Sequence, residues 1–354
     1  MISMEEPTGT VPVRPMHRFD ESKLTAWLQA NVAGYQGPLK VTQFEGGQSN
    51  PTYRLETPSS AYVLRRKPMG MLLPGAHAVD REARVQRALT TVGFPVPRVH
   101  ALCTDDGVIG SWFYVMDCVQ GRIFWDATLP SIGREERPRY FDAMNATIAQ
   151  LHRVNYASIG LGDYGRPGNF FARQIQRWSQ QYVSDVDGGR NLHMERLIEW
   201  LPAHIPPGDD ISLVHGDFRV DNMIFHPREP RVIAVLDWEL STLGHPLADF
   251  AYHLLMYRMP TAFAASLVAA NLAVLNVPAE EEYIAAYCRR TARQSIDRMD
   301  FYIVFNLFRL AAILHGIRGR IARGNAASAN AERTAAALPE LTELAWRIVE
   351  ATRR

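Results

Sequence analysis

The stretch from Leu213 to Tyr252 constrains this chain more than any other, because each of its short apolar runs is followed or preceded by an aspartate or an asparagine. The strand-like runs at its start and within it are Ser212 to Val214, Met223 to Phe225 and Val232 to Leu236. Asp217 follows the first run, Asn222 precedes the second and Asp237 ends the third. The pattern before and after this stretch is mainly helical. The sequence therefore predicts a few short strands, carrying polar residues at their ends, inserted into a helical region.

The three polar side chains have the chemistry and the spacing of a phosphoryl-transfer site. Asn222 lies five residues after Asp217, and Asp237 follows a predicted hairpin, as in the protein-kinase pattern. Asp217 is predicted to orient an attacking hydroxyl, whereas Asn222 and Asp237 offer the hard oxygen ligands that Mg²⁺ prefers. A carboxylate at the end of the apolar 232–236 run favours the metal role, since its burial there is costly without a counter-ion. The alternative for each residue is turn or N-cap chemistry.

Composition limits the partners. The chain has 354 residues, enough for two lobes with separate cores, and 38 Lys and Arg residues against 37 Asp and Glu. The balance argues against a nucleic-acid partner. Three cysteines without paired spacing predict neither disulfides nor a zinc site, and fit a cytoplasmic protein. The apolar run from Phe301 to Ile317 is interrupted by polar residues, so we expect a buried helix and no membrane partner.

The order of predicted elements gives a fold class. Residues 1–17 resemble a flexible leader, and residues 18–119 form a β-rich N-terminal lobe with strands predicted at 41–44, 52–55, 62–66 and 112–119. This lobe also contains helices at 19–31 and 80–91. Residues 120–354 form a larger, mainly helical lobe that includes the catalytic loop, the metal site and the acceptor site. The expected fold is α+β with two lobes.

The chain resembles the aminoglycoside phosphotransferase and choline kinase family, which has a protein-kinase-like fold. The resemblance rests on His215 to Asn222, Leu236 to Glu239, Gly244 to Pro246 and Asp249. Within the family, the chain is most similar to the kinase-like domains associated with acyl-CoA dehydrogenases, through Tyr62 to Pro68, Leu72 to His77 and Asp80 to Glu82. The resemblance implies ATP and Mg²⁺ as cofactors and a small-molecule hydroxyl acceptor. It also implies structural support of the catalytic loop by His215 and Asp249.

The N-terminal lobe supplies the expected nucleotide contacts. Arg65 stands where the family more often has lysine, and it is predicted to reach the phosphates and to pair with Glu82; Lys67 is the second candidate for the phosphate-binding cation. The remaining predicted contacts are Val63 on the adenine, backbone groups of Gly46, Gly47, Ser49 and Asn50 over the phosphates, and the interlobe hinge at Met116, Asp117 and Val119. The alternative for the glycine pair is an ordinary hairpin turn.

The acceptor is open to alternatives. The resemblance suggests a hydroxyacyl-CoA or a related acyl metabolite, with a functional link to an acyl-CoA dehydrogenase. Arginines in the C-terminal half are candidates to meet CoA phosphates: Arg289, Arg290, Arg293, Arg318, Arg320 and Arg323. One alternative is an aminoglycoside- or choline-type kinase, and another is a non-catalytic nucleotide-binding protein that has lost turnover.

Overall fold

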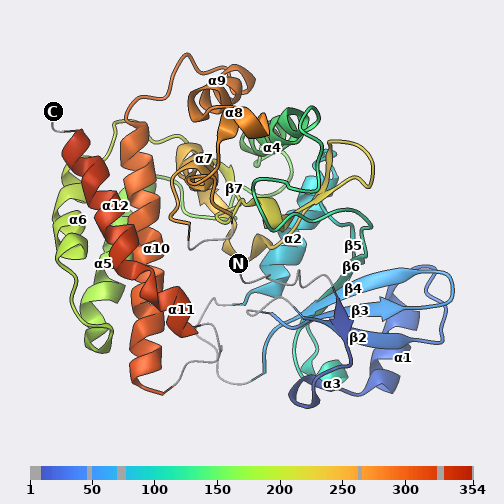
Figure 1. Cartoon of the computed structure of the whole chain (residues 1–354). Coiled ribbons are helices and arrows are strands. Elements are labelled where there is room, and N and C mark those ends of the chain that lie inside the picture. The colour runs from blue at the N-terminus through green and yellow to red at the C-terminus, as the bar shows by residue number, and fades with distance from the viewer. Residues whose placement is uncertain (1–8, 46–49, 70–76, 262–264, 325–330, 353–354) are drawn as a thin grey trace. The chain divides into compact units, whose positions relative to one another are not determined.

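The computed structural model describes residues 9–45, 50–69, 77–261, 265–324 and 331–352. It divides into two compact units, shown in Figure 1. Unit 1 consists of Met1–Trp125, Ala157–Leu161 and Asn222–Ser241, and unit 2 of Asp126–Tyr156, Gly162–Asp221 and Thr242–Arg354. Each unit has its own architecture and contains its own group of predicted site residues.

Unit 1 is built on a six-stranded antiparallel sheet. Its strands run in the order β1-β2-β3-β4-β6-β5. Their bounds are Thr10–Val11, Lys40–Phe44, Thr52–Glu56, Ala61–Arg66, Phe113–Asp117 and Val99–Cys103. Alternate residues of β3 are buried, as expected for a strand whose side chains point to opposite faces. The predicted strands are confirmed, whereas β5 and the short β1 were not predicted.

Helices cover both faces of this sheet. On one face α1 (Glu21–Asn31) buries Leu24 and Leu28 against the sheet. On the other, α2 (Val79–Thr90) buries Val79 and Ala83. The short helices η1 (Pro15–His17) and α3 (Asp106–Ile109) complete the N-terminal part. Because β1 and η1 are regular structure, the part of the predicted leader that the structure describes is ordered into unit 1.

A hairpin from the middle of the chain also belongs to unit 1. Strands β8 (Met223–Phe225) and β9 (Val232–Val235) pair antiparallel and are followed by η4 (Trp238–Leu240). Phe225 forms a β-bridge with Arg122, and the N–H of Val235 donates to the carbonyl of Pro95 at 2.8 Å. The sequence prediction placed all residues after 119 in the C-terminal lobe. In the structure, residues 222–241 group with unit 1, and the contact of Val235 with Pro95 reaches its N-terminal part.

Unit 2 is mainly helical, with α10 at its centre. Helix α10 (Met299–Ala322) packs against several other helices, among them α5 and α12, as Figure 1 shows. The other α-helices are α4 (Arg137–His152), α5 (Phe170–Ser184), α6 (Leu192–Ala203), α7 (Pro246–Leu254), α8 (Leu272–Leu275), α9 (Glu280–Arg290), α11 (Ala331–Ala336) and α12 (Leu338–Ala351). A two-stranded sheet, β7 (Ser212–Val214) with β10 (Thr242–Gly244), lies beside α7 and positions the loop that follows β7.

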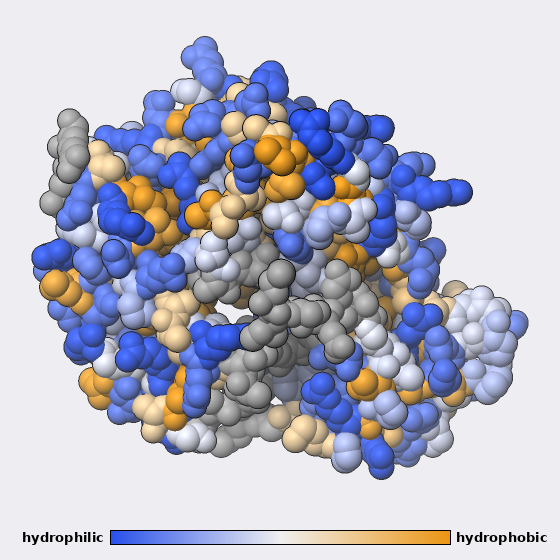
Figure 2. Space-filling view, viewed as in Figure 1, coloured by the Kyte–Doolittle hydropathy of each residue, from blue (hydrophilic) through white to orange (hydrophobic). Residues whose placement is uncertain are grey.

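Helix α10 is long and apolar enough to cross a membrane by length and composition alone. However, 72% of the most apolar 18-residue segment of α10 is buried inside the protein. Phe301, Phe305 and Phe308 of this helix pack in the core of unit 2. Hydrophilic residues are interspersed with hydrophobic ones over the face shown in Figure 2. The packing of α10 is that of a core helix, as the interrupted apolar run predicted.

Candidate active site

The backbone of the loop after β7 is bound by one buried carboxylate. Asp249, in the first turn of α7, accepts the backbone N–H groups of His215 at 2.7 Å and Gly216 at 2.8 Å. Gly216 has a φ of 85°, a left-handed conformation that glycine adopts without a Cβ penalty. The ring Nδ1 of His215 accepts the N–H of Asp217 at 3.2 Å. The predicted supporting roles of His215 and Asp249 therefore correspond to these contacts.

Asp249 is itself fixed by α4 and α9. His152 Nε2 lies 3.2 Å from its Oδ2, and His152 Nδ1 lies 2.7 Å from the hydroxyl of Tyr287. Burial opposes ionisation of Asp249, but the hydrogen bonds and charge from His152 and the N–H of His215 hold its pKa below the ordinary value. The loop therefore rests on a carboxylate that stays charged inside the core.

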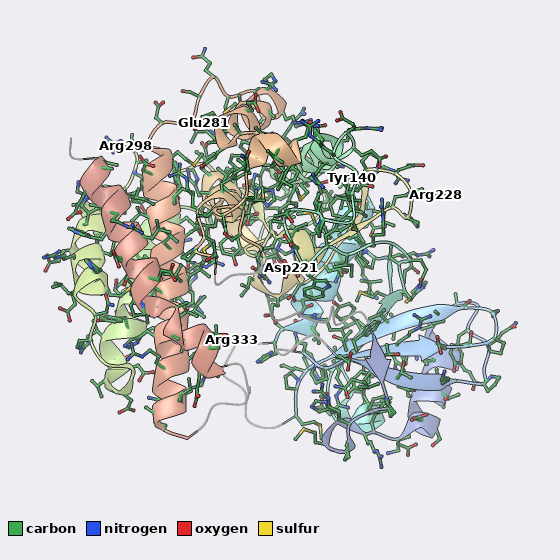
Figure 3. All side chains as sticks on the ribbon, in the orientation of Figure 1. Tyr140, Asp221, Arg228, Glu281, Arg298 and Arg333 are labelled. Atoms are coloured by element: carbon green, nitrogen blue, oxygen red, sulfur yellow. The ribbon has the colours of Figure 1, made fainter. Side chains whose placement is uncertain are left out.

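Asp217 projects from this loop and receives two donors on one oxygen. The hydroxyl of Tyr252 donates to Oδ1 at 2.6 Å, and Arg219 Nε lies 3.0 Å from the same atom. Arg219 also reaches Asp221 at 3.1 Å; Asp221 is labelled in Figure 3. Burial raises the pKa of Asp217, but Arg219 and the Tyr252 hydroxyl outweigh it and keep the pKa below its ordinary value. An ionised carboxylate can accept a hydrogen bond from an alcohol.

Several residues of this environment were not predicted from the sequence. Arg219 and Asp221 lie inside the recognised motif, so their position alone was a usable signal. Tyr252 lies three residues after Asp249, one helical turn along α7, and therefore faces the same loop. Arg309 of α10 donates to the carbonyl of Gly216. Its only sequence signal was a charge within an otherwise apolar run.

In unit 1, the buried guanidinium of one arginine lies close to three carboxylates. Arg65 Nε lies 2.9 Å from Glu82, its Nη2 lies 2.5 Å from Asp237 and 3.7 Å from Glu239. The predicted pairing of Arg65 with Glu82 is confirmed. Burial works against the charge of Arg65, but Glu82 and Asp237 raise its pKa above the ordinary value. Burial raises the pKa of Glu82, and the adjacent Arg65 opposes that rise.

Asn50 completes this cluster from the end of the predicted phosphate loop. Its side-chain amide is fully buried and donates to Glu82 at 3.0 Å and Glu239 at 3.3 Å. Its oxygen lies 3.1 Å from His77 Nδ1. The side chain of Asn50 therefore positions carboxylates. Gly46, Gly47 and Ser49, the other predicted residues of this loop, lie outside the described residues, as do residues 72–76 of the resemblance.

The two predicted metal ligands lie at the same end of the β8–β9 hairpin. Met223 pairs with Val235, and the N–H of Leu236 donates to the carbonyl of Asn222 at 2.8 Å. The register therefore places Asn222 beside the segment that leads into Asp237. Asp237 adopts a left-handed conformation, with φ 64° and ψ 60°, which is uncommon for a non-glycine residue but is more frequent for aspartate than for most others.

This donor set fits Mg²⁺ better than a transition metal. Among the residues that the structure describes, no group of three His, Cys, Asp or Glu side chains gathers as a metal site. One carboxylate and one amide suit a Mg²⁺ ion that takes its remaining ligands from phosphates and water.

The other predicted nucleotide contacts lie along two adjacent strands. Val63 of β4 pairs with Met116 of β6, and both are buried in the core next to α2. The N–H of Asp117 already donates to the carbonyl of Arg98, and its side chain lies 2.7 Å from His100. Val119 follows the end of β6. The ammonium of Lys67 lies over the ring of Trp112, 5.3 Å from its centroid.

Residues 40–301 match the phosphotransferase enzyme family. A solved structure from Ralstonia eutropha, provisionally assigned as an aminoglycoside phosphotransferase, is 45% identical with a TM-score of 0.86, covering 94% of this chain and 99% of that one. Choline kinase from Cryptosporidium parvum, at 13% identity and a TM-score of 0.54, covers 94% of this chain and 97% of its own. This second likeness concerns the fold, and together they confirm the predicted kinase-like fold.

Curated relatives extend the comparison. Acyl-CoA dehydrogenase family member 11 of Gallus gallus is 44% identical over 348 residues, which are 95% of this chain and 44% of the relative. Family member 10 of Mus musculus is 41% identical over 341 residues, 96% of this chain and 32% of the relative. The chain spans less than half the length of these relatives. The family match over most of the chain, together with the Ralstonia structure, shows that the chain belongs to the phosphotransferase enzyme family.

Proposed function

We propose that this protein transfers the γ-phosphoryl group of ATP, bound with Mg²⁺, to a hydroxyl group of a small molecule. The observation that carries the proposal is the state of Asp217. A carboxylate at the end of a buried, rigidly supported loop is held ionised by Arg219 and Tyr252. An ionised carboxylate at this position is what a residue that orients an attacking alcohol requires.

Each residue then has a chemical role. Asp217 accepts a hydrogen bond from the acceptor hydroxyl and aligns its oxygen with the γ-phosphorus. The new O–P bond forms as the bond to the ADP oxygen breaks, and the hydroxyl proton passes to Asp217. Because the pKa of Asp217 is lowered, this proton moves late, and orientation is the larger contribution. Mg²⁺, when bound, supplies charge to the phosphates; Asn222 and Asp237 would hold it.

Arg65 is the better of the two candidates for the phosphate-binding cation. It is fixed by Glu82 from α2 and lies within hydrogen-bonding distance of Asp237, the proposed metal ligand. Lys67 stacks on Trp112 instead. A planar guanidinium also presents nitrogens in two directions at once, so Arg65 can keep its ion pair with Glu82 while another nitrogen faces an anion.

The proposed acceptor is a hydroxyacyl-CoA or a related acyl metabolite. The support comes from the names of the curated relatives, which at 41–44% identity are acyl-CoA dehydrogenase family members. A functional link to such a dehydrogenase is part of the proposal. Three of the C-terminal arginines pair with carboxylates: Arg290 with Asp142, Arg293 with Asp210, and Arg323 with Asp185. Within the described ranges Arg289, Arg318 and Arg320 have no carboxylate partner, and they are the better candidates for CoA phosphates.

The test is ADP release by the purified protein with Mg-ATP and a panel of acceptors. The panel holds 3- and 4-hydroxyacyl-CoAs, choline, ethanolamine and an aminoglycoside, and Asp217→Asn serves as the inactive control. Turnover restricted to the acyl-CoAs and lost in the control supports the full proposal. Turnover on choline or an aminoglycoside replaces the acceptor. Mg-ATP binding without turnover on any acceptor identifies a non-catalytic nucleotide-binding protein and overturns the proposal.

A further inference from the structure

Tyr252 and Asp249 bring two different kinds of support from one helix to the catalytic loop. They lie one turn apart on α7. Asp249 binds the loop backbone, whereas Tyr252 reaches the functional side chain, with its hydroxyl 2.6 Å from Asp217 Oδ1. A tyrosine side chain has only two rotatable χ angles, and this one is buried at 8% exposure. Its hydroxyl is therefore a fixed donor.

Arg309 of α10 holds Tyr252 in place. Its guanidinium carbon lies 5.0 Å from the centroid of the Tyr252 ring, within cation–π distance. The same guanidinium donates to the carbonyl of Gly216, the residue that precedes Asp217. Arg309 thus joins the ring of Tyr252 to the backbone of the loop, and the core helix α10 fixes both.

The second donor to Asp217 is held less firmly. The side chain of Arg219 is 42% exposed, and it is shared between Asp217 and Asp221. A long, exposed side chain has many accessible rotamers, and ordering it costs more entropy than ordering a buried tyrosine. Between Tyr252 and Arg219, Tyr252 is therefore the donor that sets the direction of the carboxylate.

We propose that Tyr252, clamped by Arg309, is a positioning residue that fixes the orientation of the Asp217 carboxylate toward the acceptor hydroxyl. The expected effect on kcat rests on the proposed phosphotransferase function. The effect on the orientation of the Asp217 carboxylate does not. Burial and the charge of Asp217 keep the pKa of Tyr252 well above the ordinary value of a phenol. The hydroxyl is therefore a hydrogen-bond donor throughout the physiological pH range.

The decisive variant is Tyr252→Phe, which removes the hydroxyl and leaves a ring for Arg309. We expect kcat to fall about tenfold or more, as for the loss of a hydrogen bond to a charged group, with KM for ATP changed less than about twofold. Arg309→Met, which removes both of its contacts, should lower kcat in the same direction. A purely structural role would change thermal stability without separating kcat from KM.

The matched control is Tyr257→Phe. Tyr257 is also buried, lies just after α7, and donates its hydroxyl to the carbonyl of Pro278 at 3.0 Å, away from Asp217. This variant should keep the parent kcat. If Tyr252→Phe and Tyr257→Phe both keep it, the positioning role is wrong.

Crystal structures of the parent and Tyr252→Phe provide a readout that needs no turnover. We expect the Asp217 carboxylate to rotate, or to occupy two orientations, in the variant. An unchanged single orientation held by Arg219 alone overturns the inference, whatever the kinetics. If the parent turns over no acceptor, the proposed function fails, while the crystallographic comparison still decides the role of Tyr252.

Discussion

The two groups of site residues are stabilised by different interactions. In unit 2, Asp217 stands on a loop whose backbone N–H groups and neighbouring side chains are bound by buried partners from α7 and α10. In unit 1, Arg65, Asp237, Glu82 and Glu239 form a cluster of opposite charges around one cation. Hydrogen bonds to the backbone fix one geometry, whereas charges around a cation redistribute when another cation or an anion arrives.

Under the proposed function, this difference suits the two groups to different tasks. The unit 2 loop is preorganised, which suits the orientation of an attacking hydroxyl. The unit 1 cluster has one guanidinium where bound Mg²⁺ and phosphates would bring further charges, so its ion pairs are expected to exchange on nucleotide binding. Nucleotide affinity should therefore depend on unit 1, and the rate of the chemical step on Asp217 in unit 2.

The largest expected effect is on turnover in Asp217→Asn. We expect kcat to fall roughly a hundredfold to ten-thousandfold, as for the loss of a general base, while Mg-ATP binds as in the parent. Turnover is measured by ADP release and binding by calorimetry. Asp142→Asn, a change at an exposed carboxylate on α4, is the control and should match the parent in both. Loss of nucleotide affinity in Asp217→Asn contradicts the division of tasks.

Asp237→Asn should have the complementary effect. It keeps the shape of the side chain but removes the charge that a Mg²⁺ ligand needs, so Mg-dependent nucleotide affinity should fall more than about tenfold. The fold should persist, since Arg65 keeps its pairing with Glu82. Calorimetry with and without Mg²⁺ separates the effects. Parent-like Mg-ATP binding by this variant would remove Asp237 from the metal site.

A drop in pH should change the stability of the two units in different ways. Burial lowers the pKa of His253 to about 4, below the value of about 6.5 expected in the unfolded chain. Between these values the unfolded state binds more protons, so the stability of unit 2 falls as the pH drops from about 6.5 to 4, by about 3 kcal/mol for this group. Glu82 in unit 1 has the opposite sign, because its raised pKa favours the folded state at low pH.

Hydrogen exchange, corrected for the intrinsic effect of pH, tests this contrast. Peptides from α7 should lose protection between pH 7 and pH 5, and those from α2 should lose less. In His253→Asn, which retains a donor near the carbonyl of Phe218, the loss in α7 should be smaller. Equal acid sensitivity of α2 and α7 in the parent argues against the assignment of these pKa shifts.

Local patterns predicted much of the fold and part of the site. The strands at 212–214 and 223–225 were predicted to the residue, because apolar runs there are bounded by polar turns. In contrast, β5 (Val99–Cys103) was missed because it follows two closely spaced prolines and contains His100. The three-residue β10, which ends in glycine, has the composition of a turn and becomes a strand only through its pairing with β7.

Several contacts between distant segments were not predicted from the sequence. The spacing of Asp217 and Asn222 is local, so the motif predicted it. Tyr252 and Arg309 reach the loop because α7 and α10 pack around it. Helical spacing places Tyr252 on the same face as Asp249, but nothing in the sequence says that α10 brings Arg309 to the same loop. The choice between Arg65 and Lys67 was likewise left open, because strand alternation placed both on one face.

The smallest expected effect completes the comparison within unit 1. Lys67→Gln removes a charge that lies over Trp112, outside the carboxylate cluster, and should change Mg-ATP affinity less than about threefold, as for a half-buried charge without a close carboxylate in that cluster. Arg65→Gln leaves Glu82 and Asp237 without their cation and should weaken nucleotide binding far more. Arg65→Gln also risks unfolding the protein, so Arg65→Lys is the better variant to compare with Lys67→Gln. It keeps the positive charge but cannot contact Glu82 and Asp237 in the way that a guanidinium does. If Lys67→Gln proves the more damaging change, the phosphate-binding cation is Lys67, and the Arg65 cluster is structural.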